Sequence, residues 1–151
     1  VELTVIGQEV DESYVADVRQ SVCDHGLADR VTFLGRCPDE ELAAQLRNAH
    51  VLAVTSRYEG LGIVYLEAMS FGLPVLATRA GGATDVVTHG EDGYLIDPND
   101  PAAVGRALTR FASDPDRFAE MCQAAKQRYE RQPDWTETTA RVRSMLAEVV
   151  A

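Results

Sequence analysis

The chain has 151 residues and a formal net charge of -10, from 14 Lys and Arg against 24 Asp and Glu. This length favours a single domain over residues 1–151 that can bury a core without disulfides or metals. The acidic balance argues against nucleic acid or an anionic membrane surface as a partner, because both repel negative charge. No apolar run approaches the roughly 20 residues that a membrane span requires.

The cysteines and histidines point away from a metal site. Cys23, Cys37 and Cys122 are widely spaced and form no CxxC pair, which is typical of reduced thiols in a cytoplasmic protein. The three histidines also lack the spacing of metal ligands, so they are expected to pack or cap locally.

Short β-branched runs alternate with helical patterns along the first 97 residues. This alternation is the signature of βαβ units and of a parallel sheet covered on both faces. Strands are expected at residues 3–7, 31–35, 51–56, 74–78 and 93–97. Helices are expected near residues 11–25, 39–49, 62–72 and 82–89, bounded by Gly, Pro or Asp. The predicted fold class is therefore α/β, with a Rossmann-like, doubly wound parallel sheet.

The chain beyond residue 97 is predicted to be helical. Asp100 and Asp114 each precede a proline, which makes each an N-cap followed by Pro at the first helical position. Helices are therefore expected at 101–113 and 115–131, with a final helix beginning at 133–135. The apolar residues of that last helix recur at steps of three and four. This apolar face is expected to pack in a core, to be exposed, or to drive self-association.

The loop TSRYEGLG, residues 55–62, follows the third expected strand at the edge where open parallel sheets bind ligands. Gly60 and Gly62 let the backbone approach a ligand closely, and the following helix offers free N–H groups that attract phosphate. Glu59 belongs to this loop. Glu67 lies inside the helix, in an apolar run where a buried carboxylate needs backbone amides or an Arg to compensate it. The two carboxylates are placed to hold hydroxyl groups on either side of a pyrophosphate.

A pair of glycines, Gly81 and Gly82, follows the fourth expected strand in TRAGGATD. Such a pair is typical of a tight strand-to-helix turn. Because this turn would also lie at the ligand-binding edge of the sheet, direct contact with a ligand is an equally good interpretation.

The stretch EGLGIVYLEAMSFGLPVLATRAGG, residues 59–82, resembles the E-x7-E signature of retaining glycosyltransferases with the GT-B fold, in family four. Glu59 and Glu67 stand at its two glutamate positions. The resemblance continues upstream through LADRVTFLGRCPDEELAAQLRNAHVLAVTSRYEG and downstream through GGATDVVTHGEDGYLIDPNDPAAV, so it covers most of the chain. It implies the donor-binding half of a GT-B fold, in a hexosyltransferase of carbohydrate biosynthesis.

The resemblance also implies a role for each matching residue. Glu59 would be the catalytic residue, in contact with the transferred sugar, and Glu67 would hold the ribose hydroxyls. Gly35 and Arg36, after the second strand, would lie beside the base. The backbone groups that would hold the sugar and the pyrophosphate are those of Gly60, Leu61, Gly62 and Ile63. Such enzymes use neither a metal nor a cofactor, and their main task is to stabilise the leaving nucleoside diphosphate.

The sequence departs from the family pattern in several places. Thr55, Leu61 and Asp85 replace the usual Pro, Phe and Glu, which are mild changes. More seriously, the chain begins after the strand and helix whose Arg and Lys neutralise the pyrophosphate in this family. The amino-terminal, acceptor-binding domain is absent as well. Residues 1–151 are therefore expected to be truncated on their amino-terminal side and inactive in sugar transfer by themselves.

Three other functions compete with donor binding in a transferase. A non-catalytic nucleotide-sugar-binding module fits the same residues. A glycoside hydrolase would need the carboxyls of Glu59 and Glu67 to face each other about 5 to 9.5 Å apart, and their loop-then-helix placement argues against it. A dinucleotide oxidoreductase fails because the first strand runs into VIGQEVDES rather than G-x-G-x-x-G. The sequence leaves open whether the donor carries uridine, guanosine or adenosine, which sugar moves, and what accepts it; UDP binding is the expectation.

Overall fold

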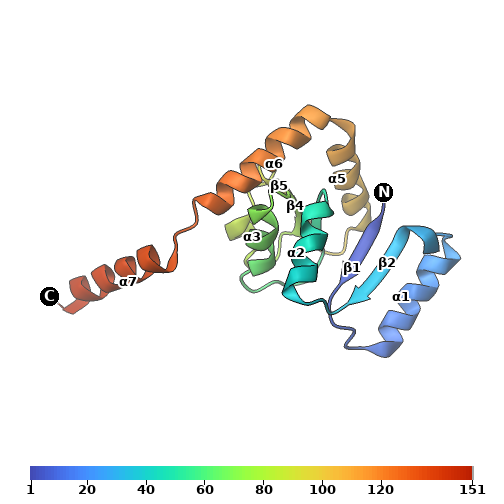
Figure 1. The fold of residues 1–151 in the computed structure, drawn as a ribbon, viewed down its shortest axis with the longest axis horizontal. Helices are drawn as coiled ribbons and strands as arrows, with labels where there is room; N and C mark the ends of the chain where they lie inside the picture. Colours follow the sequence, from blue (N-terminus) through green and yellow to red (C-terminus); the bar gives the residue numbers. More distant parts are fainter. Residues whose placement is uncertain (151) are drawn as a thin grey trace. The chain divides into compact units, whose positions relative to one another are not determined.

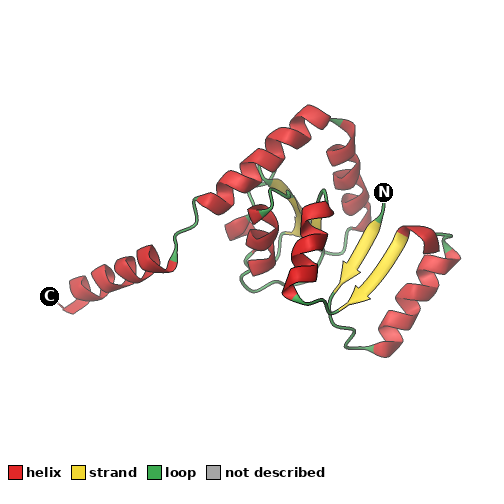
Figure 2. Ribbon diagram, in the orientation of Figure 1, coloured by secondary structure: helices red, strands yellow, loops and turns green. Residues whose placement is uncertain are grey.

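The computed structural model describes residues 1–150. The chain divides into two compact units, one from Val1 to Gln45 and one from Leu46 onward, where the sequence predicts a single domain. Figure 1 gives the course of the chain, and Figure 2 distinguishes its helices from its strands. Every expected helix and strand is present, and apart from α4 each bound lies within two residues of its expected position.

The first unit contains one parallel pair of strands and one complete helix. Its elements are β1 (Leu3–Ile6), α1 (Glu12–Asp24), the short 3₁₀ turn η1 (Ala28–Arg30), β2 (Val31–Gly35) and the larger part of α2 (Asp39–Asn48). Leu3 pairs with Val31, and the register shifts by one residue at the end of the ladder, where Ile6 pairs with Gly35. The connection between parallel strands through α1 is the expected βα unit.

The second unit contains a three-stranded parallel sheet in the order β3-β4-β5. Its elements are β3 (Leu52–Val54), α3 (Ile63–Ser70), β4 (Val75–Thr78), α4 (Ala83–Val86), β5 (Gly93–Ile96), α5 (Pro101–Ser113), α6 (Pro115–Glu130) and α7 (Trp135–Val150). Helix α4 is shorter than the predicted 82–89 because Val87 is already extended. The next amide, that of Thr88, donates to the carboxylate of Asp92 at 2.7 Å instead of to a helical carbonyl.

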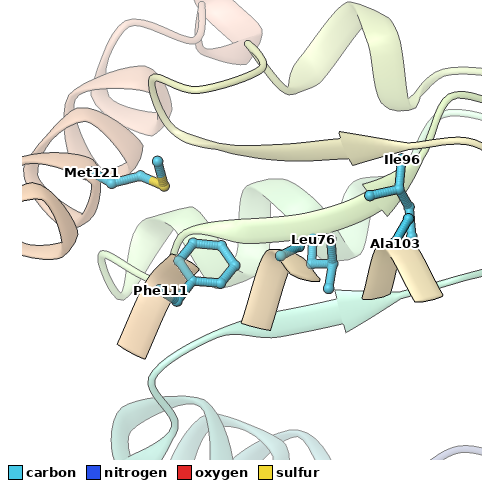
Figure 3. Packing of buried hydrophobic residues seen from close by; sticks show 6 residues of the cluster. Leu76, Ile96, Ala103, Phe111 and Met121 are labelled. Carbon is cyan, nitrogen blue, oxygen red and sulfur yellow. The ribbon is translucent and has the colours of Figure 1, made fainter. Parts of the chain in front are cut away.

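The central strand β4 is buried along its whole length. Leu76 points to one face, where it joins a cluster with Ile96 of β5 and with side chains of α5 and α6; these are Ala103, Ala107, Phe111 and Met121 (Figure 3). Successive side chains of a strand alternate between faces, so Val75 and Ala77 point to the other face. Helix α3 packs against β4 there, so helices cover both faces of this sheet.

Helix α6 contacts two other helices of the second unit and donates hydrogen bonds to the ends of α3 and α4. It packs against both α3 and α5. Arg128 donates to the backbone oxygens of Asp85, at 2.7 Å, and Val86, at 3.1 Å, and so satisfies the end of α4. Lys126 does the same at the end of α3 by donating to the backbone oxygen of Ser70 at 2.7 Å. Carbonyl groups at helix ends lack intrahelical partners, so these contacts fix where α3 and α4 stop.

The predicted helix starts are confirmed. The carboxylate of Asp100 accepts from the amide of Ala103 at 3.0 Å, and that of Asp114 accepts from the amide of Arg117 at 3.0 Å. Each is followed by Pro at the first helical position, as expected.

The apolar face predicted for the last helix is exposed in α7. Trp135 is 84% exposed and Met145 is 66% exposed. Of the three alternatives, packing within the core of the described chain is therefore wrong for this face. No helix among residues 1–150 is both long enough and apolar enough to cross a membrane.

Candidate functional site

The loop between β3 and α3 is shaped by a glycine that no other residue can replace without strain. Gly62 is the N-cap of α3 and has the left-handed conformation φ 71°, ψ 43°. A Cβ atom there would lie 2.3 Å from two ring carbons of Tyr65. The start of the loop is held from the neighbouring strand, because the hydroxyl of Thr78 donates to the backbone oxygen of Ser56 at 2.5 Å. The loop therefore leaves the sheet edge in a fixed direction.

Several amide N–H groups of this loop have no acceptor. Among residues 1–150, none accepts from the backbone amides of Gly60, Leu61 or Gly62, and no side chain caps α3. The first amides of α3 add further donors, because a helix leaves its first N–H groups unpaired. Leu61 and Ile63 are largely exposed, at 66% and 61%. The loop thus contains several backbone donors without a partner, next to two exposed side chains.

The glycine pair after β4 is hydrogen-bonded to this loop and packs closely against it. The amide of Gly82 donates to the backbone oxygens of Glu59, at 2.9 Å, and Gly60, at 3.0 Å. A Cβ atom at Gly82 would lie 2.3 Å from the oxygen of Gly60, and one at Gly81 would lie 1.8 Å from the oxygen of Glu59. Of the two interpretations of this pair, the tight turn is therefore confirmed, and the turn is packed directly against the site.

The two predicted carboxylates lie on the same β3–α3 segment. Glu59 is half-buried in the loop, and Glu67 is in the second turn of α3, as expected. The predicted burial of Glu67 is wrong, because its side chain is exposed. The buried residues of α3 are Tyr65, Ala68 and Met69, and at about 100° per residue Glu67 lies roughly 150° away from the middle of that face. Within the described chain, neither carboxylate accepts a hydrogen bond, so both are available to a ligand.

The residues predicted to lie beside a base belong to the first unit. Gly35 is the last residue of β2 and has a positive φ of 66°, and its backbone oxygen accepts from the amide of Gly7 at 2.8 Å. Arg36 is exposed. Glu59, the loop at 60–63 and Glu67 therefore lie on one segment of the second unit, and Gly35 and Arg36 lie at the end of β2 in the first unit.

One residue of the site was missed by sequence reasoning. Tyr65 is completely buried, and its hydroxyl has no hydrogen-bond partner among the described residues. Burial raises the pKa of this phenol, and the negative charge of Glu59 raises it further. A signal was present in the sequence, because Tyr65 is the one polar side chain in the run from Ile63 to Leu66.

A hollow of about 210 Å³ lies elsewhere, between β5 and α5. It is lined by Arg79, Arg106 and Arg110, yet each of these already faces a partner. Arg106 pairs with Asp100 at 2.9 Å, and the guanidinium of Arg110 lies over the ring of Tyr94. Among residues 1–150, no group of three or more His, Cys, Asp or Glu side chains is placed to hold a metal ion.

The amino-acid sequence is similar to a known protein family and to its curated members. The family model described as Glycosyl transferases group 1 matches residues 1–128. Over 141 residues, the chain is 36% identical to the GDP-mannose-dependent alpha-(1-6)-phosphatidylinositol monomannoside mannosyltransferase of Mycolicibacterium smegmatis, covering 89% of this chain and 37% of that protein. Over 130 residues, it is 35% identical to the D-inositol 3-phosphate glycosyltransferase of Corynebacterium efficiens, covering 86% of this chain and 30% of that protein. The chain therefore spans about a third of the length of these relatives.

Solved structures share the fold. HepE from Anabaena in complex with UDP matches with a TM-score of 0.88 and 27% identity, covering 98% of this chain and 41% of that one. Sucrose-phosphate synthase from Thermosynechococcus elongatus matches with a TM-score of 0.84 and 28% identity, covering 99% of this chain and 38% of that one. These likenesses confirm the predicted α/β fold class.

Proposed function

Because this chain belongs to the Glycosyl transferases group 1 family, whose GT-B fold it shares, we propose that residues 1–151 are the donor-binding part of a retaining hexosyltransferase. The observation that carries this proposal is the row of unpaired amides at 60–62 between the carboxylates of Glu59 and Glu67. Backbone N–H groups at a helix start bind phosphate groups. Carboxylates on either side are suited to accept hydrogen bonds from sugar hydroxyls.

Each part of the donor is proposed to have a counterpart among the residues predicted from the sequence. The amides at 60–63 hold the pyrophosphate and the sugar attached to it. Glu67, one turn further along α3, accepts from the ribose hydroxyls, for which its exposure leaves room. Glu59 contacts the transferred sugar. Gly35 and Arg36 contact the base, with the positive φ of Gly35 turning the backbone at the end of β2.

The proposed chemistry follows from where charge develops. As the bond between the anomeric carbon and the diphosphate oxygen breaks, the sugar gains oxocarbenium character and the leaving group gains negative charge. Fixed N–H donors aimed at that oxygen stabilise the leaving diphosphate without a metal. The carboxylate of Glu59 stabilises the positive charge on the sugar. The acceptor hydroxyl attacks the anomeric carbon from the face that the diphosphate leaves, which retains the configuration, and its proton passes to the leaving diphosphate.

The complete reaction is proposed to need more of the protein than residues 1–151. The chain spans 37% of the length of the mannosyltransferase relative and 30% of that of the glycosyltransferase relative. We propose that acceptor binding belongs to another domain, so that the isolated chain binds a donor without transferring its sugar. A non-catalytic binding module predicts the same binding, and transfer by the longer protein distinguishes the two.

Calorimetric titration of the chain tests the proposal. The nucleotides are UDP, GDP and ADP, each with and without glucose or mannose attached, since one relative is named for GDP-mannose and one similar solved structure is a complex with UDP. One nucleotide is expected to bind, and EDTA is expected to leave its affinity unchanged. Glu67→Ala should weaken that binding by at least about tenfold, because hydrogen bonds to a charged group contribute roughly 1.5–3 kcal/mol.

Glu130→Ala is the matched control, because Glu130 is also an exposed glutamate of a helix but lies at the end of α6. It should bind the nucleotide as the unmodified chain does. Binding of none of the nucleotides, or equal effects of the Glu67 and Glu130 substitutions, would contradict the proposed site.

A further inference from the structure

Tyr65 carries a hydroxyl group that the fold does not use. Its side chain is fully buried and its hydroxyl has no partner among residues 1–150. A buried hydroxyl without a hydrogen bond destabilises the folded chain. Phenylalanine would fill the same space without that cost, so the hydroxyl calls for an explanation outside the packing of α3.

The ring of Tyr65 packs at the start of α3, which limits the groups that its hydroxyl can contact. Long side chains on a helix point back toward its amino-terminal end. Accordingly, the ring of Tyr65 lies against Gly62 at the start of α3, where a Cβ atom would be 2.3 Å from it. The ring thus lies against the β3–α3 loop. Because Tyr65 is completely buried, a ligand that binds from solvent cannot contact its hydroxyl directly.

Glu59 offers the acceptor that the hydroxyl lacks. Its negative charge acts on the phenol, and together with burial it raises the pKa of Tyr65. Glu59 as a whole is half-buried, and its carboxylate accepts no hydrogen bond within the described chain. The backbone of Glu59 is fixed from below, because its oxygen accepts from Gly82 at 2.9 Å. Glu59 lies three residues before Gly62, beside which the ring of Tyr65 packs, so the unpaired hydroxyl and the unpaired carboxylate belong to the same β3–α3 segment.

We propose that Tyr65 is a positioning residue of the donor site, whose hydroxyl donates a hydrogen bond to the carboxylate of Glu59 when a nucleotide sugar is bound. This inference rests on the proposed function. The hydrogen bond orients the carboxylate toward the transferred sugar. Tyr65 thus acts through Glu59 and touches neither the nucleotide nor the sugar.

The test compares Tyr65→Phe with the unmodified chain by calorimetry, using UDP against UDP-glucose and GDP against GDP-mannose. For the pair that binds, Tyr65→Phe should weaken the nucleotide sugar by about tenfold, the worth of roughly 1.4 kcal/mol. The affinity for the nucleoside diphosphate alone should stay within about twofold, since Glu59 faces the sugar. The same variant should melt roughly 2–4 °C higher, because it removes an unsatisfied buried hydroxyl.

A second variant, Glu59→Gln, completes a double-mutant cycle. In the Glu59→Gln background, Tyr65→Phe should have no further effect on the nucleotide sugar, because the carboxylate through which it acts is gone. A tenfold loss in both backgrounds, an equal loss for the nucleoside diphosphate, or no loss in the unmodified background would overturn the positioning role. Those outcomes leave the proposed function intact. An unmodified chain that binds no nucleotide overturns both.

Discussion

The contact between Gly82 and the β3–α3 loop allows a sharp prediction for Gly82→Ala. Gly82 has φ -69° and ψ -5°, a conformation that alanine adopts without strain. The effect of the substitution is therefore steric. The new methyl carbon would lie 2.3 Å from the backbone oxygen of Gly60 and 3.0 Å from the Cα of Leu61. A carbon and a carbonyl oxygen approach to roughly 3.3 Å, so the loop must move by about 1 Å.

The expected cost has two parts. Overpacking of a tight contact costs about 1–3 kcal/mol. The shift also lengthens the hydrogen bonds from the amide of Gly82 to Glu59 and Gly60, now 2.9 and 3.0 Å, each of which contributes about 0.5–1.5 kcal/mol. Since the loop is partly exposed and yields, we expect the free energy of unfolding to fall by about 1–3 kcal/mol. A displacement of 1 Å also misplaces the amides at 60–62, which should weaken nucleotide binding by at least about tenfold.

Denaturant unfolding gives the free energy, and calorimetric titration with the nucleotide gives the affinity. Gly105→Ala is the control, because a Cβ atom at Gly105, within α5, meets no heavy atom within 4 Å. That variant should gain about 0.5–1 kcal/mol from helix propensity and bind normally. If Gly82→Ala unfolds and binds like the unmodified chain, the turn does not hold the loop, and the reasoning fails.

Two further predictions concern the stability of the second unit. Burial raises the pKa of Asp92, so the folded chain favours the protonated carboxyl. This group's contribution to the free energy of unfolding is therefore full at low pH and is lost as pH rises through the folded pKa. In denaturant unfolding at a series of pH values, the advantage of Asp92→Asn over the unmodified chain should therefore grow from pH 3 to pH 7, and a pH-independent difference would contradict it. Met121→Ala should lower the free energy of unfolding by about 2–5 kcal/mol, because Met121 is 1% exposed. Met145→Ala, at a position 66% exposed, should change it by less than about 0.5 kcal/mol in the same assay, and equal losses would refute the assigned core.

Features decided by neighbouring residues were predictable from the sequence. The N-caps Asp100 and Asp114 are examples, because a carboxylate followed by proline satisfies the first amides of the helix that it starts. The β-branched strands and their parallel pairing follow from the same local pattern. The fold class was therefore accessible, and so was the loop that carries Glu59.

Features decided by contacts between distant segments were not predictable. The sequence shows Glu67 within an apolar run, but which side of α3 is buried depends on where β4 and α6 pack against it. Glu67 turned out to be exposed for this reason. The division of the chain into two units is also tertiary information, because it depends on which strands pair, and each unit contains its own sheet.

The glycines of the site do not all have the same cause. Gly62, Gly81 and Gly82 are required by the chain itself, because a Cβ atom at any of them would collide with Tyr65 or with the loop backbone. Gly60 is different: a Cβ atom there meets nothing within 4 Å, and its φ is not positive. Neither packing nor backbone strain explains a glycine at that position. Close approach of a ligand to the backbone does explain it, and Gly60 lies between Glu59 and the unpaired amides that follow. Of the four glycines, Gly60 is therefore the one that argues most directly for the proposed donor site, while the other three hold the loop in place.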